Sequence, residues 1–296
     1  MLRCFYGHRG SILADEMGLG KTVQVVSLLE HIYRVENVKG PFLVVVPLST
    51  IEHWRREFDG WTDMQLCVYH DSGMMVGGGS SSREMRDVIR EYEWYWKNRS
   101  RRLLKFHVLL TTYEDLIKDF EHLLEIPWHT VVIDEAHRLR NQVSKLLQCL
   151  KDILPKGILT YGYQHRVLMT GTPLQNDIKE MWTLLNFIEA EKFPSLEEFQ
   201  ELYGSMETKS QVLALQRQLE PHLLRRVKED VASDIPPKLE TIIDVELTTV
   251  QKQFYRAIFE KNHSFLFKGA KAGAPKLLNV QIQLRKVCNH PFLITG

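Results

Sequence analysis

The sequence predicts a doubly wound α/β domain followed by a helical appendage. β-branched and apolar runs recur over about residues 8–190, and each is followed by residues with helical spacing of their apolar side chains. Strands that are apolar throughout and alternate with helices form parallel sheets covered on both faces. Beyond about residue 195 the strand signals stop while helical spacing continues, which predicts the appendage.

The expected elements follow the chain in order. The strands are Ile12–Ala14, Phe42–Val46, Phe106–Thr111, Val131–Ile133 and Val167–Met169. The helices between and after them cover roughly 21–35, 50–60, 83–97, 143–151 and 176–188. In the appendage, residues 208–220, 249–267 and 276–288 have helical spacing, and Pro236-Pro237 separates the first of these from the others. Residues 71–82 are rich in glycine and serine and are expected to form a surface insertion.

Composition narrows the class of protein without naming a function. The chain has 296 residues, 44% hydrophobic and 25% charged, which is ordinary for a globular protein. No apolar run approaches the roughly 18 residues that cross a bilayer, so no membrane is expected as a partner. The four cysteines are far apart and predict neither a zinc site nor a disulfide framework. A net charge of +1 does not by itself indicate a nucleic-acid binder.

A glycine-rich turn between the first strand and the first helix predicts a nucleotide phosphate site. Such a turn brings backbone N–H groups and a helix N-terminus to phosphate oxygens. Gly18 and Gly20 let the backbone wrap closely around a phosphate, and Leu19 lies between them. Lys21 is expected to bridge the β- and γ-phosphates, and the Thr22 hydroxyl to ligate Mg²⁺. The generic pattern has glycine where this chain has Asp15.

The acidic pair Asp134-Glu135 follows a buried strand and predicts the second half of the site. Ligands of open α/β sheets bind at the carboxyl ends of the strands. Asp134 is expected to hold Mg²⁺ through its water shell, and Glu135 to orient and deprotonate the attacking water. Alone, an Asp-Glu pair is also a common helix start, favoured by the helix dipole. The glycine turn and the acidic pair together favour a Mg-nucleotide site.

The wording of these motifs resembles one family of helicase-like ATPases. Asp134-Glu135 continues as Ala136-His137, as in superfamily two, and Ile12–Gln24 is similar to motif I of the SWI/SNF-related chromatin-remodelling ATPases, in which Asp stands at position 15. Further similar blocks follow in family order: Pro47–Ile51 with Trp54 (motif Ia), Leu110–Glu114 (Ib), Leu168–Asn176 (III), Leu223–Val231 and Arg285–Pro291. The resemblance covers nearly the whole chain and implies a RecA-like lobe.

Within that family, the sequence looks most like the chromodomain-helicase-DNA-binding branch, and it leans toward the kismet-like subgroup. Gly40–Val44 and Asp134–Asn141 carry the first likeness, and Glu240–Ile243 and Glu260–Leu266 the second. The resemblance implies hydrolysis of ATP with Mg²⁺ coupled to translocation on double-stranded DNA, repositioning of nucleosomes and a nuclear location. It disfavours an RNA helicase, because motif III reads Thr170-Gly171-Thr172-Pro173 instead of Ser-Ala-Thr.

The resemblance also assigns roles outside the phosphate loop. Motifs Ia and Ib imply contacts with the DNA backbone, which do not read bases. The matching side chains are Ser49, Thr50, Thr111 and Thr112, although threonines at strand ends also commonly bond nearby backbone groups. His137, Gly171 and Thr172 are expected to couple the γ-phosphate to DNA binding. Arg225, Arg226 and Lys228 form a basic cluster, which is either a solvated helix face or a brace between two lobes.

The family pattern finally predicts how the chain is divided. Residues 1–194 are expected to form the first ATPase lobe, and residues 195–296 a helical protrusion with the start of a linker to a second lobe that this sequence does not contain. That lobe of the same parent protein is the expected partner, since it supplies arginine fingers worth ~10³–10⁵ in rate. The isolated chain is therefore expected to be inactive or very weak. The alternative is a non-catalytic fragment that binds DNA or a protein partner.

Overall fold

The computed structural model describes residues 1–70, 82–96, 103–139, 145–153, 164–171, 178–203, 209–231, 239–260 and 280–294. Contacts divide the chain into two compact units, Met1–Asp234 and Ile235–Gly296. The first unit holds the sheet and most of the helices, and the second is a small helical body. Each is described by itself.

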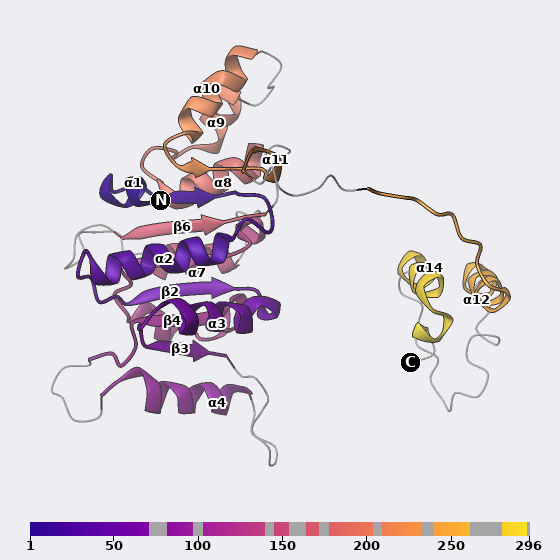
Figure 1. Ribbon diagram of the computed structural model, residues 1–296, viewed down its shortest axis with the longest axis horizontal. Helices are drawn as coiled ribbons and strands as arrows, with labels where there is room; N and C mark the ends of the chain where they lie inside the picture. Colours follow the sequence, from indigo (N-terminus) through magenta and orange to yellow (C-terminus); the bar gives the residue numbers. More distant parts are fainter. Residues whose placement is uncertain are drawn as a thin grey trace. The chain divides into compact units, whose positions relative to one another are not determined.

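A seven-stranded parallel sheet forms the centre of the first unit, with strand order β3-β4-β2-β5-β6-β1-β7. The strands are β1 (Ser11–Leu13), β2 (Phe42–Val46), β3 (Leu66–Tyr69), β4 (Val108–Thr112), β5 (Thr130–Ile133), β6 (His165–Met169) and β7 (Leu223–Leu224). In Figure 1 their arrows point the same way, so every strand ends at one edge of the sheet. The predicted doubly wound α/β class is confirmed.

Helices cover both faces of the sheet, as its apolar strands require. Val44 and Val132 share one core with residues of α2 (Lys21–Arg34) and α3 (Ile51–Trp61). Val45 and Val131 face the opposite way and share a second core. The helices of that second face are α5 (Tyr113–Lys118), α6 (Phe120–Leu124), α7 (Lys145–Ile153) and α8 (Ile178–Ile188).

The remaining elements of the first unit are short. They are α1 (Leu2–Tyr6), the 3₁₀ turns η1 (Leu48–Thr50) and η3 (Ala136–Leu139), α4 (Ser82–Ile89) continued by the π-helix η2 (Arg90–Trp94), α9 (Leu196–Tyr203), α10 (Lys209–Leu219) and α11 (Lys228–Val231). No helix in the described part of the chain is both long and apolar enough to span a membrane.

The structure differs from the prediction at two strands and at several short helices. β3 was not predicted, because only alternate residues of Leu66–Tyr69 are buried and the run is brief. The expectation that no strand follows residue 195 is wrong at Leu223–Leu224, which pairs with β1. Two residues are too few for a periodic pattern. The short helices α1, α5, α6 and α9 were likewise not predicted. The insertion predicted for 71–82 lies outside the described residues except for Ser82.

Among its described residues, the second unit has the helices α12 (Thr249–Phe259) and α14 (Val280–Asn289) and the 3₁₀ turn η4 (Pro291–Leu293). α12 begins with a capping box between Thr248 and Gln251, and Ile258 packs against Val287 in a small core. The predicted helical appendage is confirmed here. The contact boundary at residue 234 nevertheless groups α9, α10 and α11 with the sheet, so a lobe boundary at residue 194 stays a proposal.

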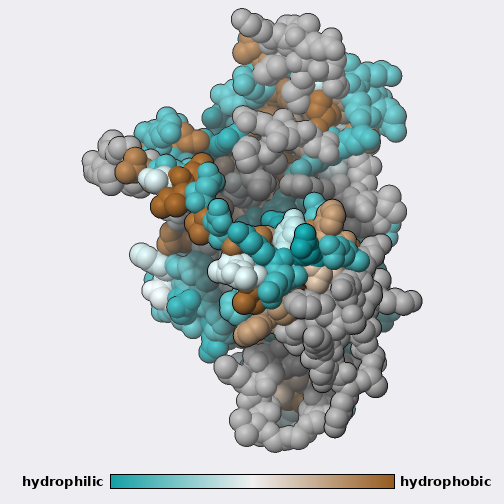
Figure 2. All heavy atoms as spheres, turned by 90° about the vertical axis from the view of Figure 1, so that its right-hand side faces the viewer, coloured by the Kyte–Doolittle hydropathy of each residue, from teal (hydrophilic) through white to brown (hydrophobic). Residues whose placement is uncertain are grey.

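An exposed apolar stretch precedes α12. Leu239, Ile242 and Val245 are 93%, 86% and 83% exposed. On the face drawn in Figure 2, brown apolar residues lie among teal polar ones, so this side of the molecule mixes both kinds of surface.

Candidate nucleotide site and the motifs around it

The predicted phosphate loop joins β1 to α2 at the carboxyl edge of the sheet. Gly18 and Gly20 have φ angles of +91° and +73°, a region that side chains disfavour. Gly20 directly precedes α2, so Lys21 and Thr22 open that helix, and Leu19 lies in the turn before it. The Lys21 ammonium donates to the backbone oxygen of Asp15 at 2.8 Å. Loop, helix N-terminus and lysine thus have the arrangement that a phosphate site needs.

Asp134 lies at the end of β5, two strands from β1 in the sheet. Its carboxylate is 9% exposed and accepts two hydrogen bonds, from Trp54 Nε1 at 3.0 Å and from the Glu135 backbone N–H at 2.9 Å. Burial raises the pKa of Asp134, while the Trp54 bond and the charge of Lys21 oppose that shift. Lys21 and Asp134 therefore lie close enough to interact, although 113 residues separate them in the sequence.

Glu135 has an unusual backbone. Its φ of +49° is the left-handed region, which non-glycine residues rarely adopt. Its side chain is 31% exposed, and the His137 Nδ1 lies 3.1 Å from its Oε2. Strained conformations of this kind persist where the surroundings enforce them and are common at functional sites. Asp134 is 9% exposed and the Glu135 side chain is 31% exposed, so the two carboxylates have different environments.

Gly171 brings motif III to the phosphate loop. It follows β6, which lies between β5 and β1. A Cβ atom at this position would be 3.0 Å from Met17 Cγ and 3.8 Å from Lys21 Nζ. The end of β6 therefore lies against the loop and its lysine. Thr172, the other expected coupling residue of this motif, lies outside the described residues.

Asp15 is fully buried and paired with Arg226. Burial would raise its pKa, but hydrogen bonds from Arg226 and Gln24 and the Arg226 charge outweigh burial, so the pKa of Asp15 is lowered. The sequence predicted that Arg226 belongs either to a solvated helix face or to a brace between two lobes, and neither interpretation includes a contact with Asp15. Gln24 and Trp54 are quoted in the family motifs, yet sequence reasoning gave neither a role at the site. No local signal links Asp15 to a residue 211 positions away.

The four candidate DNA-contacting side chains differ in accessibility. Ser49 is exposed in η1, and Thr50 Oγ1 donates to the Pro47 oxygen at 3.0 Å. Thr111 and Thr112 are buried, and their hydroxyls donate to the Tyr69 oxygen and to Asp115 Oδ2, each at 2.9 Å. Of the four, only Ser49 offers an exposed side chain.

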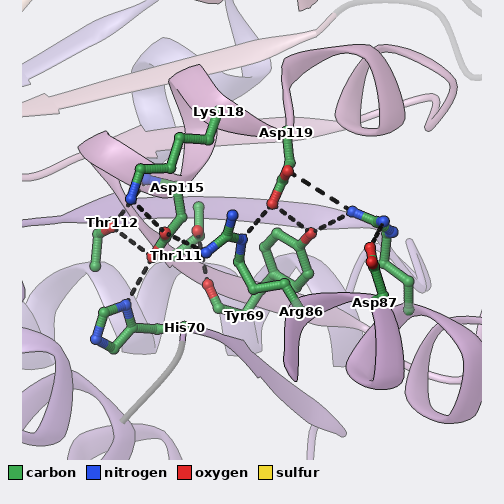
Figure 3. Close-up of polar contacts among 10 residues, drawn as sticks. Tyr69, His70, Arg86, Asp87, Thr111, Thr112, Asp115, Lys118 and Asp119 are labelled. Atoms are coloured by element: carbon green, nitrogen blue, oxygen red, sulfur yellow. Dashed lines mark hydrogen bonds and ion pairs between the residues drawn. The ribbon is translucent and has the colours of Figure 1, made fainter. Parts of the chain in front are cut away.

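A charged network includes Asp115, the acceptor of the Thr112 hydroxyl (Figure 3). Arg86 of α4 is 3% exposed and pairs with Asp115 at 3.3 Å and, more closely, with Asp119. His70 Nδ1 lies 2.6 Å from Asp115, and Tyr69 donates to Asp119 at 2.8 Å. The network joins α4, β3 and α5 at the end of β4.

Comparison with known proteins identifies the family. The sequence matches the SNF2-related domain over residues 1–293. The chain belongs to the SNF2-related ATPase family. It is 49% identical over 99% of its length to chromodomain-helicase-DNA-binding protein 8 of Homo sapiens, and 48% identical to protein 7 of Homo sapiens and protein 6 of Rattus norvegicus. It spans 11%, 9% and 10% of these relatives.

Solved structures agree with this assignment. The SNF2-related ATPase core of Sulfolobus solfataricus in complex with dsDNA has a TM-score of 0.63 and 26% identity, over 99% of this chain and 57% of that one. The same core without DNA has a TM-score of 0.60 and 27% identity, over 99% of this chain and 55% of that one. The expected RecA-like fold and the likeness to the chromodomain-helicase-DNA-binding branch, with its kismet-like subgroup, are confirmed.

Proposed function

We propose that this chain is the ATP-binding lobe of a DNA-translocating motor that remodels nucleosomes in the nucleus. One observation carries the proposal: the phosphate loop, Asp134-Glu135 and Gly171 meet at the carboxyl edge of one parallel sheet. Such an edge is where open α/β sheets bind ligands. Membership of the SNF2-related family and the DNA-bound structural neighbour support the same reading.

The residues at this edge fit Mg-ATP. The two left-handed glycines carry no side chains, so backbone N–H groups at these positions can approach phosphate oxygens closely. Lys21 supplies a positive charge to the phosphates, and Thr22 and Asp134 supply the oxygen atoms that Mg²⁺ prefers. When bound there, Mg²⁺ would supply positive charge next to the phosphates. It would also offset the cost of burying the Asp134 carboxylate.

Glu135 is suited to hold the attacking water. Its carboxylate is more accessible than that of Asp134, and His137 lies beside it. Within hydrogen-bond reach of a water, Glu135 would accept its proton as the water attacks the terminal phosphorus. His137 and Gly171 would transmit the state of this site, since Gly171 lies against Met17 and near Lys21.

DNA is proposed to contact the chain through Ser49 and the backbone around Thr50, Thr111 and Thr112. The exposed Ser49 hydroxyl can donate to a phosphate oxygen. The two motif Ib hydroxyls already have internal acceptors, so their part is to order the backbone that faces DNA. Sequence-independent contacts of this kind suit a chain with a net charge of +1.

The 296-residue polypeptide is proposed to bind nucleotide but to hydrolyse it very weakly without the rest of the parent protein. The ATPase core of Sulfolobus solfataricus is longer than this chain, which covers 57% of it. An arginine finger from a second lobe would supply ~10³–10⁵ in rate. The alternative, a fragment that binds DNA or a protein partner without using ATP, predicts no nucleotide affinity at all.

Titration with a fluorescent ATP analogue, with and without Mg²⁺, separates these possibilities. We expect wild-type binding that Mg²⁺ strengthens. Lys21→Ala should abolish binding, and Asp134→Asn should remove only the effect of Mg²⁺, because its amide can still accept the Trp54 bond.

Wild-type chain that binds no nucleotide would contradict the proposal and favour the alternative. Robust DNA-stimulated hydrolysis by the 296-residue polypeptide would contradict the proposed need for a second lobe.

A further inference from the structure

The edge strand β7 continues alongside the phosphate loop. We call residues 222–228 the edge segment. Three backbone hydrogen bonds join the edge segment to β1 and to the residues that follow β1. The N–H groups of Ile12, Ala14 and Glu16 donate to the backbone oxygens of His222, Leu224 and Arg226 at 2.7, 2.7 and 2.9 Å. The third bond lies past the end of β1, in the loop itself. Parallel pairing therefore extends from the sheet into the first part of the phosphate loop.

Arg226 binds both oxygens of the buried Asp15 carboxylate. Its backbone N–H donates to Oδ1 at 2.9 Å, and its guanidinium Nε lies 3.1 Å from Oδ2 and 3.2 Å from Oδ1. A second guanidinium nitrogen donates to Asp15 and, at 2.7 Å, to Gln24 Oε1. A planar guanidinium can meet two acceptors in fixed geometry, which a lysine ammonium cannot do.

Gln24 connects this pair to the middle of the loop. Its amide nitrogen donates to Asp15 Oδ2 at 3.2 Å and to the Leu19 oxygen at 2.9 Å. Gln24 lies in the first turn of α2, so Arg226 is linked to both ends of the loop. The Asp15 backbone oxygen in turn accepts from Lys21. Moving Asp15 would therefore also move the acceptor that holds the lysine.

Lys228 gives a second contact between the edge segment and the loop. Its backbone N–H donates to Glu16 Oε2 at 2.7 Å. Its side chain lies over Gly18, where a Cβ atom would be 3.3 Å from Lys228 Cε. The edge segment thus follows the loop from Asp15 to Gly18.

We propose that Arg226 is a positioning residue for the phosphate loop, acting through Asp15 and Gln24. This role rests on the proposed nucleotide site and goes beyond it, because Arg226 is assigned to the ATP site instead of to a solvated face or a contact between lobes. Asp15 stands where the generic phosphate-loop motif has glycine. It serves as an internal acceptor that fixes the loop from the side.

The test measures affinity for the fluorescent ATP analogue with Mg²⁺, together with urea unfolding, in matched variants. Arg226→Ala should weaken nucleotide binding about tenfold, which corresponds to about 1.4 kcal/mol. Arg226→Lys should also be weaker than wild type, because it keeps the charge but not the fork. The neighbouring exposed Arg225→Ala is the control and should bind like wild type.

A double variant, Asp15→Asn with Arg226→Leu, separates positioning from simple neutralisation of a buried charge. It removes both charges, so it should recover much of the unfolding free energy lost in Arg226→Ala while its nucleotide affinity stays low. If the double variant or Arg226→Lys binds nucleotide like wild type, Arg226 only neutralises Asp15 and the positioning role is wrong.

The result also separates this inference from the proposed function. If Arg226→Ala is folded and binds like Arg225→Ala, while Lys21→Ala still abolishes binding, the positioning role is overturned and the nucleotide site stands. If wild type binds no nucleotide, both are overturned.

Discussion

Two buried aspartates stand at the carboxyl edge of the sheet, and each is paired with an arginine. Asp15 follows β1 and binds Arg226, whereas Asp115 begins α5 after β4 and binds Arg86. Both carboxylates are nearly inaccessible, but the arginines differ. The Arg226 side chain is 41% exposed and that of Arg86 is 4% exposed. Arg86 also has a second carboxylate partner, Asp119.

The Arg226–Asp15 pair contacts the proposed ligand-binding loop, whereas the Arg86–Asp115 pair is structural. Arg226 holds a loop whose lysine and glycines are proposed to bind a ligand. Arg86 pairs with Asp115 and Asp119 at the junction of α4, β3 and α5, and Asp115 also accepts from the Thr112 hydroxyl (Figure 3). Loss of the first pair should change binding more than stability, and loss of the second should do the reverse.

The largest expected effect is on the Arg86–Asp115 pair. Arg86→Met should lower the free energy of unfolding by about 3–5 kcal/mol, because it leaves two buried carboxylates without their shared counter-ion. Urea unfolding measures this loss. Nucleotide affinity of the folded variant should match wild type, since the network lies at β4 and not at the phosphate loop. A stability loss below that of Arg226→Ala would contradict the comparison.

A third buried group, His165, lies at the start of β6 and should determine how stability changes in mild acid. Burial, helped by His129, lowers the pKa of His165 to about 3. In the unfolded chain His165 binds a proton near pH 6.5, but in the folded chain it stays neutral until about pH 3. The free energy of unfolding therefore falls as pH falls from about 6.5 toward 3. The pKa values of Asp15 and Asp119 are also lowered despite burial, through their arginine partners. Their stabilisation is present above about pH 3.8 and is lost only below it.

As pH falls from 7 to 5, His165 should therefore lower the free energy of unfolding by about 2 kcal/mol, whereas Asp15 and Asp119 should not change it in this range. His165→Leu should flatten that part of the pH dependence in urea unfolding, whereas the exposed His53→Gln should leave it unchanged. An unchanged slope in His165→Leu would assign the loss to another buried histidine, such as His129, whose pKa is also lowered by burial.

The smallest effect concerns the hydroxyls of motifs Ia and Ib. Thr112→Val removes the cap of α5, which bonds the Asp115 N–H at 3.2 Å, and should cost about 1 kcal/mol of unfolding free energy. Ser49→Ala should leave stability within about 0.5 kcal/mol. In DNA-binding assays of the parent protein, Ser49→Ala should weaken binding without shifting the unfolding midpoint. The opposite assignment, a stability loss for Ser49→Ala, would show that its hydroxyl is structural.

Local sequence order made much of the fold predictable. Phe42–Val46 and Val131–Ile133 are apolar throughout because both faces of a parallel strand are covered, and this pattern is visible within five residues. β7 escaped prediction because its two residues are defined only by their pairing with β1. The glycine loop and Asp134-Glu135 were recognisable because each motif is contiguous.

The sequence by itself therefore determined the fold class, the phosphate loop and its acidic partner. Only the tertiary structure decided which residues support them: Arg226 holds Asp15, and Trp54 bonds Asp134. It also decided that the Thr111 and Thr112 hydroxyls are internal. The physical reason is that the motif residues are contiguous and depend on local backbone geometry. The partner of a buried carboxylate instead depends on which distant segment the strand order places beside it.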